Sequence, residues 1–584
     1  MEGTLSNRLT PLQTLRRHPY LILAFCCLLV HAASCISGAD PLPTDMLLMI
    51  VCLMAGGLLF YGLSRRASTG RRIPLIVSLG GILAIGVWTA FYPQSNFPVR
   101  YLLTGGLLFL LAAALWLLCT GGLNASRVVL LMLAAGFLLR AAYILYTNGI
   151  TRQHDFWYFD NIYGHAGYIR YLYDNGHLPD FDPLTRSQYY QPPLHHAIAA
   201  LWMRLNTWLG LSVLQAGESV QVLTLFYSSA CMLLSYRILR ELELKGMALL
   251  VPMAILCFHP TFIILGGSSN NDILCTTLML AAILWTIRWY HAPTFTHILF
   301  IALSVGFAMM TKLFGAMVAP AIAVVFLIKL IQNHKAPGRL IGQYAAFGAV
   351  VFPLGLWWGI RNLIRFGTPI TYVPMISSDD GQYVGYIPAL KRLFDFSPHQ
   401  FSSVFTAWGD KNADYFEYNP TIYLLKSSLF GEYDYSFAGS AMKPAATFLF
   451  VVNTVLILLS VAAFCWILFS RRSQLEPPIR AFWAVLAAVM LISYYQFSLT
   501  FAHTCSMDIR YVVPIILVGT VMIGLMLRHC QQEGRVYRLI RGCTAALTGA
   551  VTPAGYDIPE TPAQIAECAY ECWKAGAAVV HLHM

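Results

Sequence analysis

The sequence predicts an all-α protein that crosses a membrane many times, and three observations support this. Hydrophobic residues make up 58 % of the 584-residue chain and charged residues only 11 %, whereas soluble domains carry roughly 25 % charged residues. Uncharged apolar runs long enough to cross a bilayer recur along most of the chain. Lys and Arg collect between alternate runs, a pattern that orients membrane helices and accounts for the net charge of +11 without nucleic acid.

The apolar runs predict about 14 transmembrane helices of roughly 20 residues each. The predicted spans are 20–37, 46–63, 74–92, 101–119, 127–147, 219–239, 248–266, 272–290, 297–311, 314–332, 340–360, 446–469, 481–499 and 511–527. Lys312 and Gly315 interrupt the pair 297–311 and 314–332, so these two could instead form one broken hairpin. Most of the 14 cysteines lie inside the runs, and we expect them to behave as small apolar residues.

The distribution of basic residues sets the expected topology. Basic clusters that follow alternate spans are Arg65-Arg66, Arg240 with Lys245, Lys335 with Arg339, and Arg471-Arg472. The positive-inside rule assigns these clusters, and with them both termini, to the cytoplasm. We therefore expect a multi-pass protein of a bacterial plasma (inner) membrane. The outer face then receives the loops 148–218 and 361–445 and the turns 268–272 and 500–510.

The first outer loop contains two predicted surface helices. Residues 164–175 show an amphipathic helical pattern that ends at Gly176. Residues 194–211 follow Pro192-Pro193, and this run is short and too polar for a span. We expect it to lie along the membrane surface, because counting it as a span would move the basic loops to the outer face.

Charged residues on the outer face predict a functional site there. They are Asp155, Asp160, Asp272, Lys312, Arg361, Glu432, Asp508 and Arg510. Several stand in turns that are too short to form a domain, and charge at the mouth of a membrane helix is costly enough to suggest function. The alternative is that these loops are simply polar.

Short motifs occur in a definite order in these outer segments. They are Asp160-Asn161, Gly176-His177-Leu178-Pro179, Pro192-Pro193-Leu194, Ser269-Asn270-Asn271-Asp272, Thr311-Lys312-Leu313-Phe314-Gly315, Arg361-Asn362, and Asp508 with Arg510-Tyr511. Over residues 127–527 this order resembles the GT-C superfamily of membrane glycosyltransferases, in its aminoarabinose transferase and protein O-mannosyltransferase branch (glycosyltransferase family 39 type). Asn161 stands where the family has a second acid, and Gln191 stands where the aminoarabinose branch has a lysine.

The resemblance implies a GT-C fold and transfer of a sugar from a polyprenyl-phosphate donor to an acceptor hydroxyl on the non-cytoplasmic face. Such a transfer needs a carboxylate that takes the acceptor proton. Asp160 is the expected base and Asp155 the alternative, although Asp160 could also cap the helix that follows it. Which sugar and which acceptor are used stays open.

The transfer also needs cations that stabilise the phosphate leaving group. The expected ligands are Lys312, Arg361 and Arg510, with Tyr511 nearby; the alternative for each cation is an ordinary position at the membrane interface. Gln191 and Glu432 are further candidates for substrate contact. Asp272 is expected to orient the acceptor, to hold a metal ion or to cap its own helix, and the sequence leaves these alternatives open.

No cofactor is predicted, and a requirement for a divalent cation stays open. Four histidines of the first outer loop would suffice by number as the ligands of a zinc site: His165, His177, His195 and His196. Their spacing matches no zinc-binding motif, so no metal site is assigned. The expected partners are the donor, a lipid, glycan or protein acceptor, and membrane lipids. The alternative function is a transporter or flippase of polyprenyl-linked glycans or lipids, although transporters typically hold charge at the membrane midplane on broken helices.

These features divide the chain into four parts. They are residues 1–126 with extra transmembrane helices, 127–527 with the glycosyltransferase core, 528–541 as a basic cytoplasmic linker, and 542–584. The last part has an α/β-like pattern, and with its pair His581 and His583 it resembles the start of the β-keto acid cleavage enzymes, a TIM-barrel family. One such unit cannot bury its own sheet, so we expect a truncated fragment from a fusion or gene boundary, without that activity.

Overall fold

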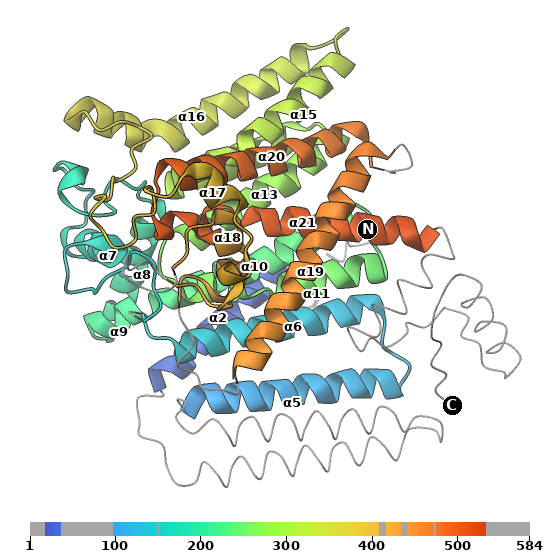
Figure 1. Ribbon diagram of the computed structural model, residues 1–584, viewed down its shortest axis with the longest axis horizontal. Coiled ribbons are helices and arrows are strands. Elements are labelled where there is room, and N and C mark those ends of the chain that lie inside the picture. Colours follow the sequence, from blue (N-terminus) through green and yellow to red (C-terminus); the bar gives the residue numbers. More distant parts are fainter. Residues whose placement is uncertain are drawn as a thin grey trace, which may run out of the picture.

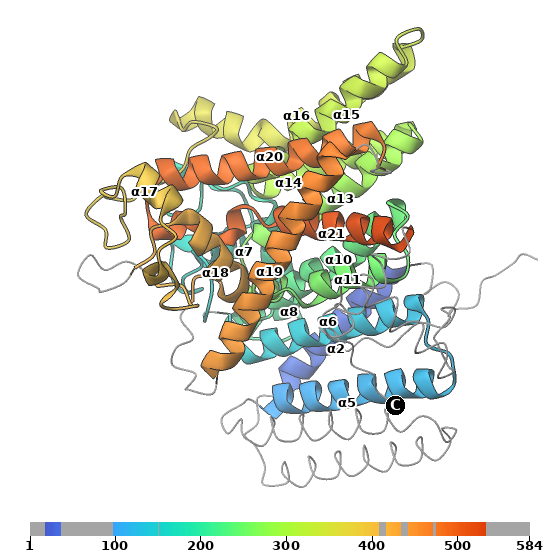
Figure 2. The same ribbon diagram turned by 45° about the vertical axis from the view of Figure 1, so that its right-hand side comes forward.

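The computed structural model describes residues 18–36, 97–149, 151–407, 416–433, 442–470 and 475–532. These residues form α-helices joined by loops and short 3-10 turns, and no strand occurs among them. Most of the long helices run in one direction, whereas α19 crosses them obliquely (Figures 1 and 2). The predicted spans 46–63 and 74–92 and the fragment 542–584 lie outside the described residues.

The long helices follow the predicted spans closely. They are α2 (Pro19–Ile36), α5 (Phe97–Cys119), α6 (Ala125–Tyr146), α10 (Val220–Glu241), α11 (Met247–Phe258), α12 (Pro260–Gly267), α13 (Asp272–His291), α14 (Phe295–Thr311), α15 (Ala319–Gln332), α16 (Gly338–Phe366), α19 (Met442–Phe469), α20 (Pro477–Thr500) and α21 (Pro514–Gln532). Within the described residues, nine helical stretches are long and apolar enough to cross a membrane. Three shorter apolar helices lie at Pro19–Ala32, Gly105–Cys119 and Phe295–Thr311.

One predicted span is two helices. The run 248–266 divides into α11 and α12 at His259-Pro260, where His259 has extended backbone angles and its ring accepts the N–H of Thr261. Proline cannot donate the helical hydrogen bond and disfavours a helical residue before it. The predicted pair 297–311 and 314–332 is likewise joined by a tight 3-10 turn, η2 (Leu313–Val318).

The central helices pack through large buried side chains and small residues. Trp289 of α13 and Trp483 of α20 are fully buried in the main core. Gly306 of α14 and Gly355 of α16 lie against Leu354 and Met309, so close that an added Cβ would stand 3.0 and 2.8 Å from those side chains. Small residues of this kind let membrane helices approach one another closely.

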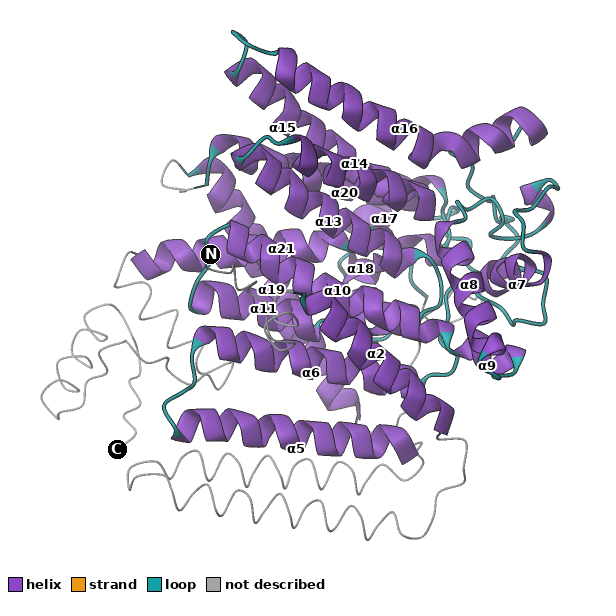
Figure 3. Ribbon diagram, turned by 180° about the vertical axis from the view of Figure 1, so that it is seen from behind, coloured by secondary structure: helices purple, strands orange, loops and turns teal. Residues whose placement is uncertain are grey.

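Shorter helices gather at one end of the bundle, on the left in Figure 1 and the right in Figure 3. They are α7 (Gly164–Asn175), α8 (Leu194–Trp208), α9 (Val213–Glu218), α17 (Ala389–Phe394) and α18 (Pro420–Phe430). The helices predicted at 164–175 and 194–211 are thus present. Gly176 ends α7 with a left-handed φ of 73°, which glycine adopts without strain. The loops that the sequence assigns to one membrane face therefore meet.

Candidate active site

A cavity of about 1020 Å³ opens among these loops and the nearest helix ends. Its polar lining comes from the first loop and from the turns that follow α14 and α20, and includes Asp155, Tyr190, Gln191, Lys312, Arg510 and Tyr511. Its apolar lining comes from η2, α15, α16 and α20, and includes Phe314, Met317, Pro320, Trp358, Val489 and Phe497. The cavity therefore joins a charged end to walls made by the membrane helices.

Asp155 brings a carboxylate to the charged end of the cavity. Its Oδ2 accepts a hydrogen bond from Arg510 Nη1 at 2.7 Å, and its side chain is 43 % exposed. Burial of the surrounding loop would raise the pKa of Asp155, but the neighbouring Arg510 guanidinium outweighs this and lowers it below its ordinary value. Asp155 is therefore an ionised carboxylate that Arg510 holds in one position.

The backbone of the first loop is unusual around Asp155. Arg152, Asp155 and Trp157 have positive φ angles of 56°, 53° and 59°, which are uncommon for residues other than glycine. The carbonyls of Asp155 and Phe156 accept the N–H groups of His165 and Ala166 at the start of α7, each at 2.9 Å. Such conformations cost free energy and gather at functional sites. They turn Asp155 outward while its neighbours pack inward.

Lys312 supplies the second cation of the cavity. It follows α14 as the helix cap, and its Nζ forms an ion pair with the Asp272 carboxylate at the start of α13. The ammonium also lies 5.2 Å from the centre of the Tyr511 ring. The turn is tight because Gly315 of η2 packs directly against α14. A Cβ added to Gly315 would stand 2.5 Å from the backbone of Ala308. Lys312 is thus held between a carboxylate and an aromatic face.

Asp272 is buried rather than open to the cavity. It is 3 % exposed, and Asn270 Nδ2 donates a hydrogen bond to its Oδ2 at 2.9 Å. It occupies the first turn of α13, where the helix dipole favours negative charge, while the helix cap is Asn271. Asp272 therefore orients Lys312 and does not itself line the cavity.

Arg510 is positioned by its own short turn. Asp508 begins the 3-10 turn η6 (Ile509–Tyr511), and its Oδ1 accepts the N–H of Arg510 at 2.7 Å. The guanidinium carbon lies 4.9 Å from the centre of the Tyr511 ring. Arg510 is 6 % exposed, and although burial opposes its charge, the Asp155 carboxylate raises its pKa above its ordinary value. Arg510 thus stays cationic.

Asp160, the base expected from the sequence, lies elsewhere. It is exposed on the turn before α7, and among the described residues no ion pair joins it to Lys312 or Arg510. The physical reason is which side chains of this loop are buried. His154, Phe156 and Phe159 pack into the protein, and Asp155, between the first two, points to the cavity instead. The alternative base, Asp155, is the carboxylate that pairs with Arg510 on the cavity lining.

Arg361, the third expected phosphate ligand, also stands apart from the cavity lining. It lies near the end of α16, where it donates a hydrogen bond to the carbonyl of Pro179 and covers the ring of Trp358 at 4.7 Å. Trp358 in turn lines the cavity and donates to the carbonyl of Tyr190 at 3.1 Å. In this arrangement Arg361 joins the first loop to α16.

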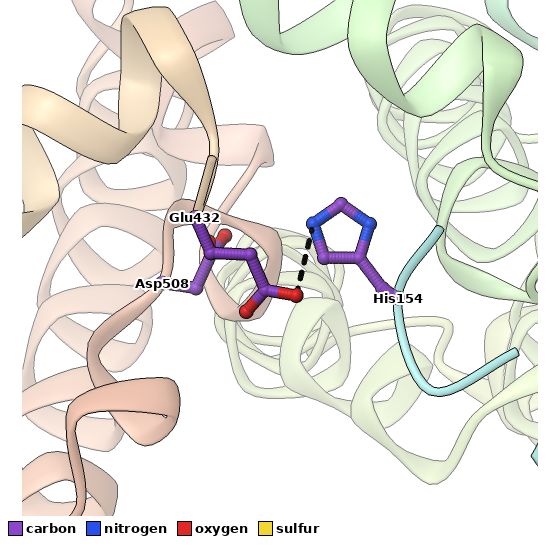
Figure 4. Close-up of side chains that lie close together, drawn as sticks. All are labelled: His154, Glu432 and Asp508. Carbon is purple, nitrogen blue, oxygen red and sulfur yellow. Dashed lines mark ion pairs between the residues drawn. The ribbon is translucent and has the colours of Figure 1, made fainter. Parts of the chain in front are cut away.

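The remaining expected contacts divide between the cavity and the layer behind it. Gln191 lines the cavity and donates to the Tyr190 hydroxyl at 3.1 Å. Glu432 is not among the lining residues; its Oε1 is 3.8 Å from His154 Nε2, and Asp508 is close by (Figure 4). Burial raises the pKa of Glu432 to about 8 and that of Asp508 to about 6. His154 was not singled out by the sequence, because nothing local links it to the long loop.

The four histidines considered for zinc do not come together as one site. His165 Nδ1 lies 2.8 Å from His196 Nε2, and their rings are stacked. His195 Nε2 instead lies 2.9 Å from the carbonyl of Ser269, and His177 is exposed. The buried histidines join α7, α8 and the turn before α13. Of these histidines, His165 lines the cavity, and His196 packs behind it.

Comparison with known families gives two matches. Residues 191–358 match the family model of the dolichyl-phosphate-mannose-protein mannosyltransferases, and residues 542–584 match that of the beta-keto acid cleavage enzymes. No curated protein matches the chain. Both resemblances read from the motifs are thereby confirmed, the first over a narrower range than 127–527. The first match contains Gln191, Asp272 and Lys312; the second lies outside the described residues.

Proposed function

We propose that this protein, a membrane glycosyltransferase of the dolichyl-phosphate-mannose-protein mannosyltransferase type, transfers a sugar from a polyprenyl-phosphate donor to an acceptor hydroxyl at the outer membrane face, with Asp155 as general base. The observation that carries the proposal is the convergence of Asp155, Lys312 and Arg510 on one cavity. A carboxylate and two cations are the groups that such a transfer requires.

Asp155 is suited to accept the proton of the acceptor hydroxyl. Its side chain is open to the cavity and is held by Arg510 at 2.7 Å. A general base must lie within hydrogen-bond reach of the proton that it removes, and the exposed part of this carboxylate is available to an acceptor. Removal of the proton as the hydroxyl attacks the sugar carbon would make the acceptor oxygen a stronger nucleophile.

Lys312 and Arg510 are suited to bind the departing phosphate. Both line the same cavity, and each forms an ion pair with a carboxylate. Negative charge grows on the phosphate oxygen as its bond to the sugar breaks, and cations fixed beforehand stabilise that charge without reorganisation. Arginine adds a planar pair of donors for phosphate oxygens.

The walls of the cavity match the other parts of such a donor. Phe314, Met317 and Trp358 provide apolar surface beside the membrane helices, which suits a polyprenyl chain. Tyr190 and Tyr372 both line the cavity, and their rings meet edge to face at 5.3 Å between centres. Aromatic rings offer flat apolar faces with a polar tip, which suits a sugar ring.

The proposal includes a GT-C arrangement of the core 127–527. In it, loops 148–218 and 361–445 face outward, residues 1–126 add helices, and the linker 528–541 and both termini are cytoplasmic. Support comes from the gathering of the outer segments at one end of the bundle (Figure 3) and from the basic clusters in the sequence. The fragment 542–584 takes no part in the transfer.

Mass spectrometry of membrane lipids and surface glycans tests the proposal. Cells that lack the gene should accumulate the unused polyprenyl-phosphate sugar and lose one glycan modification. Complementation with the natural chain should reverse both changes, whereas Asp155→Asn should reverse neither. Unchanged donor levels in the deletion strain would contradict a transferase and favour the transporter alternative.

A further inference from the structure

Three side chains from separate outer segments lie close together, and one of them, His154, directly precedes Asp155 in the chain. His154 comes from the first loop, Glu432 from the residues after α18, and Asp508 from the turn before α21 (Figure 4). One nitrogen or oxygen atom from each lies within 4.8 Å of the other two. Within the described residues, this is the group of His, Cys, Asp and Glu side chains whose spacing suits a metal ion.

Two carboxylate oxygens of the group are buried without a partner. Glu432 Oε2 and Asp508 Oδ2 have no hydrogen-bond donor among the described residues. The Glu432 side chain is 7 % exposed and Asp508 is 1 % exposed, so water cannot easily serve them. An unpartnered buried carboxylate oxygen is costly, and two of them in one cluster with an imidazole favour a bound cation.

The charge of the surrounding residues points the same way. Lys312 pairs with Asp272 and Arg510 pairs with Asp155, and in the described part of the chain no Lys or Arg side chain forms an ion pair with Glu432 or Asp508. Buried charge of one sign is unfavourable unless it is paired or bound to a metal ion, and a divalent cation would balance it.

The imidazole of His154 is oriented as a metal ligand would be. Its Nδ1 lies 3.3 Å from Ser268 Oγ and 3.2 Å from the Tyr433 hydroxyl. When Nδ1 carries the proton and donates to Ser268, the lone pair of Nε2 lies on the side of Glu432, with the Tyr433 hydroxyl 3.5 Å away. Ligating histidines commonly donate through their second nitrogen in this way, which fixes the tautomer.

From this geometry we propose that His154, Glu432 and Asp508 bind a divalent metal ion, Zn²⁺ or Mn²⁺. One imidazole nitrogen with carboxylate oxygens is a ligand set that these ions accept, whereas Ca²⁺ and Mg²⁺ prefer oxygen alone. The ion would join three segments that are remote in sequence. Since Asp155 follows His154 and Arg510 lies two residues after Asp508, it would also fix the ion pair at the cavity.

Metal analysis of the purified full-length chain tests this site. Inductively coupled plasma mass spectrometry should find zinc or manganese in the natural chain. Glu432→Gln should bind this metal at least about tenfold more weakly and retain less of it, because even the loss of an outer-shell partner costs about that much affinity. Glu218→Gln is the matched control. That acid also lies in the outer segments and accepts the N–H of Gly149 at 2.7 Å, away from the site, so its metal content should not change.

A second measurement covers variants that fold poorly. The natural chain stripped with chelator should unfold at a higher temperature when Zn²⁺ or Mn²⁺ is added back, because a ligand of the folded state stabilises it. His154→Gln and Asp508→Asn should lose this response. The proposal is overturned if the natural chain neither carries nor responds to either metal, or if Glu432→Gln binds as much metal as the natural chain.

Discussion

The Asp155 carboxylate and the Arg510 guanidinium, 355 positions apart in the chain, form a hydrogen-bonded ion pair of 2.7 Å. This contact joins the first outer loop to the turn that precedes α21. It also fixes both side chains on the lining of the same cavity. The proposed chemistry depends on this pair.

Asp155→Asn should lower sugar transfer by at least about 100-fold, the usual contribution of a general base. The amide keeps the size of the side chain but cannot take the acceptor proton. Asp160→Asn should leave transfer nearly unchanged, because that side chain is exposed outside the cavity lining. Transfer from donor to acceptor in purified variants, with thermal unfolding as a folding check, measures both. Loss of transfer in Asp160→Asn with full activity in Asp155→Asn would exchange their roles.

Lys312→Met should destabilise the protein by about 3–5 kcal/mol, because it leaves a buried carboxylate without its partner. The carboxylate is that of Asp272, which is 3 % exposed. Adding Asp272→Asn to this variant should restore much of the stability but none of the transfer, since the phosphate ligand is still missing. Thermal unfolding and turnover of the single and double variants separate the two effects. Recovery of transfer in the double variant would remove Lys312 from phosphate binding.

Gly164→Ala should disturb the loop that carries Asp155. Gly164 has a φ of 73°, and an added Cβ would stand 2.3 Å from the Trp157 ring and 2.8 Å from the carbonyl oxygen of Asp155. We expect a loss of stability above about 1 kcal/mol together with reduced transfer. The control is Gly342→Ala in α16, which meets no atom within 4 Å and should be neutral or slightly stabilising. Equal behaviour of the two variants would contradict this account of the loop.

Stability should fall in acid because three buried histidines of α7 and α8 stay neutral in the folded state. Burial lowers the pKa of His165 to about 3 and of His195 to about 4, and the pKa of His196 well below its ordinary value. The unfolded chain takes up these protons near pH 6.5, so the contribution of these histidines to stability should be constant above that pH and decline as pH falls toward about 4.

His165→Asn should make this acid-induced decline shallower by up to about 1.4 kcal/mol per pH unit. His334→Asn, which changes an exposed side chain in the turn after α15, should leave it unchanged. Unfolding of the natural chain and both variants at a series of pH values provides the comparison. Identical slopes for His165→Asn and the natural chain would mean that this histidine does not contribute.

Cysteine labelling should separate the two membrane faces. Leu184→Cys lies in the first loop, where Leu184 is 43 % exposed, and Lys335→Cys lies in the turn between α15 and α16. A membrane-impermeant maleimide should label the first variant in intact cells and the second only after lysis, above the background of the natural chain. The reverse pattern would invert the proposed topology.

Much of the fold could be predicted from the chain because it depends on local composition. Each predicted span within the described residues falls on a helix or a helix pair, since an uncharged apolar run has few alternatives in a bilayer. Gly176 predicted the end of α7 through its backbone freedom, and Pro260 divides a predicted span for the equally local reason that it lacks a donor.

The charged residues of the site were also visible in the sequence, but their partners were not. Asp155 and Asp160 are five positions apart in the same loop, and the sequence does not distinguish their roles. In the structure, the positive φ of Asp155 and its buried neighbours on each side turn Asp155 to the cavity. Arg361 and Arg510 both stand in motifs that resemble those of the family. In the structure, Arg361 donates a hydrogen bond to the carbonyl of Pro179, whereas Arg510 pairs with Asp155.

The sequence by itself determined that the chain is a multi-pass membrane protein whose charged loop motifs resemble those of membrane glycosyltransferases, because hydropathy, basic clusters and motifs are properties of neighbouring residues. Only the tertiary structure decided which carboxylate meets which cation, and that His154, Glu432 and Asp508 share one buried space. These contacts join loops that are far apart in the chain. They follow from how the helices pack and how each loop folds back, which no local pattern encodes.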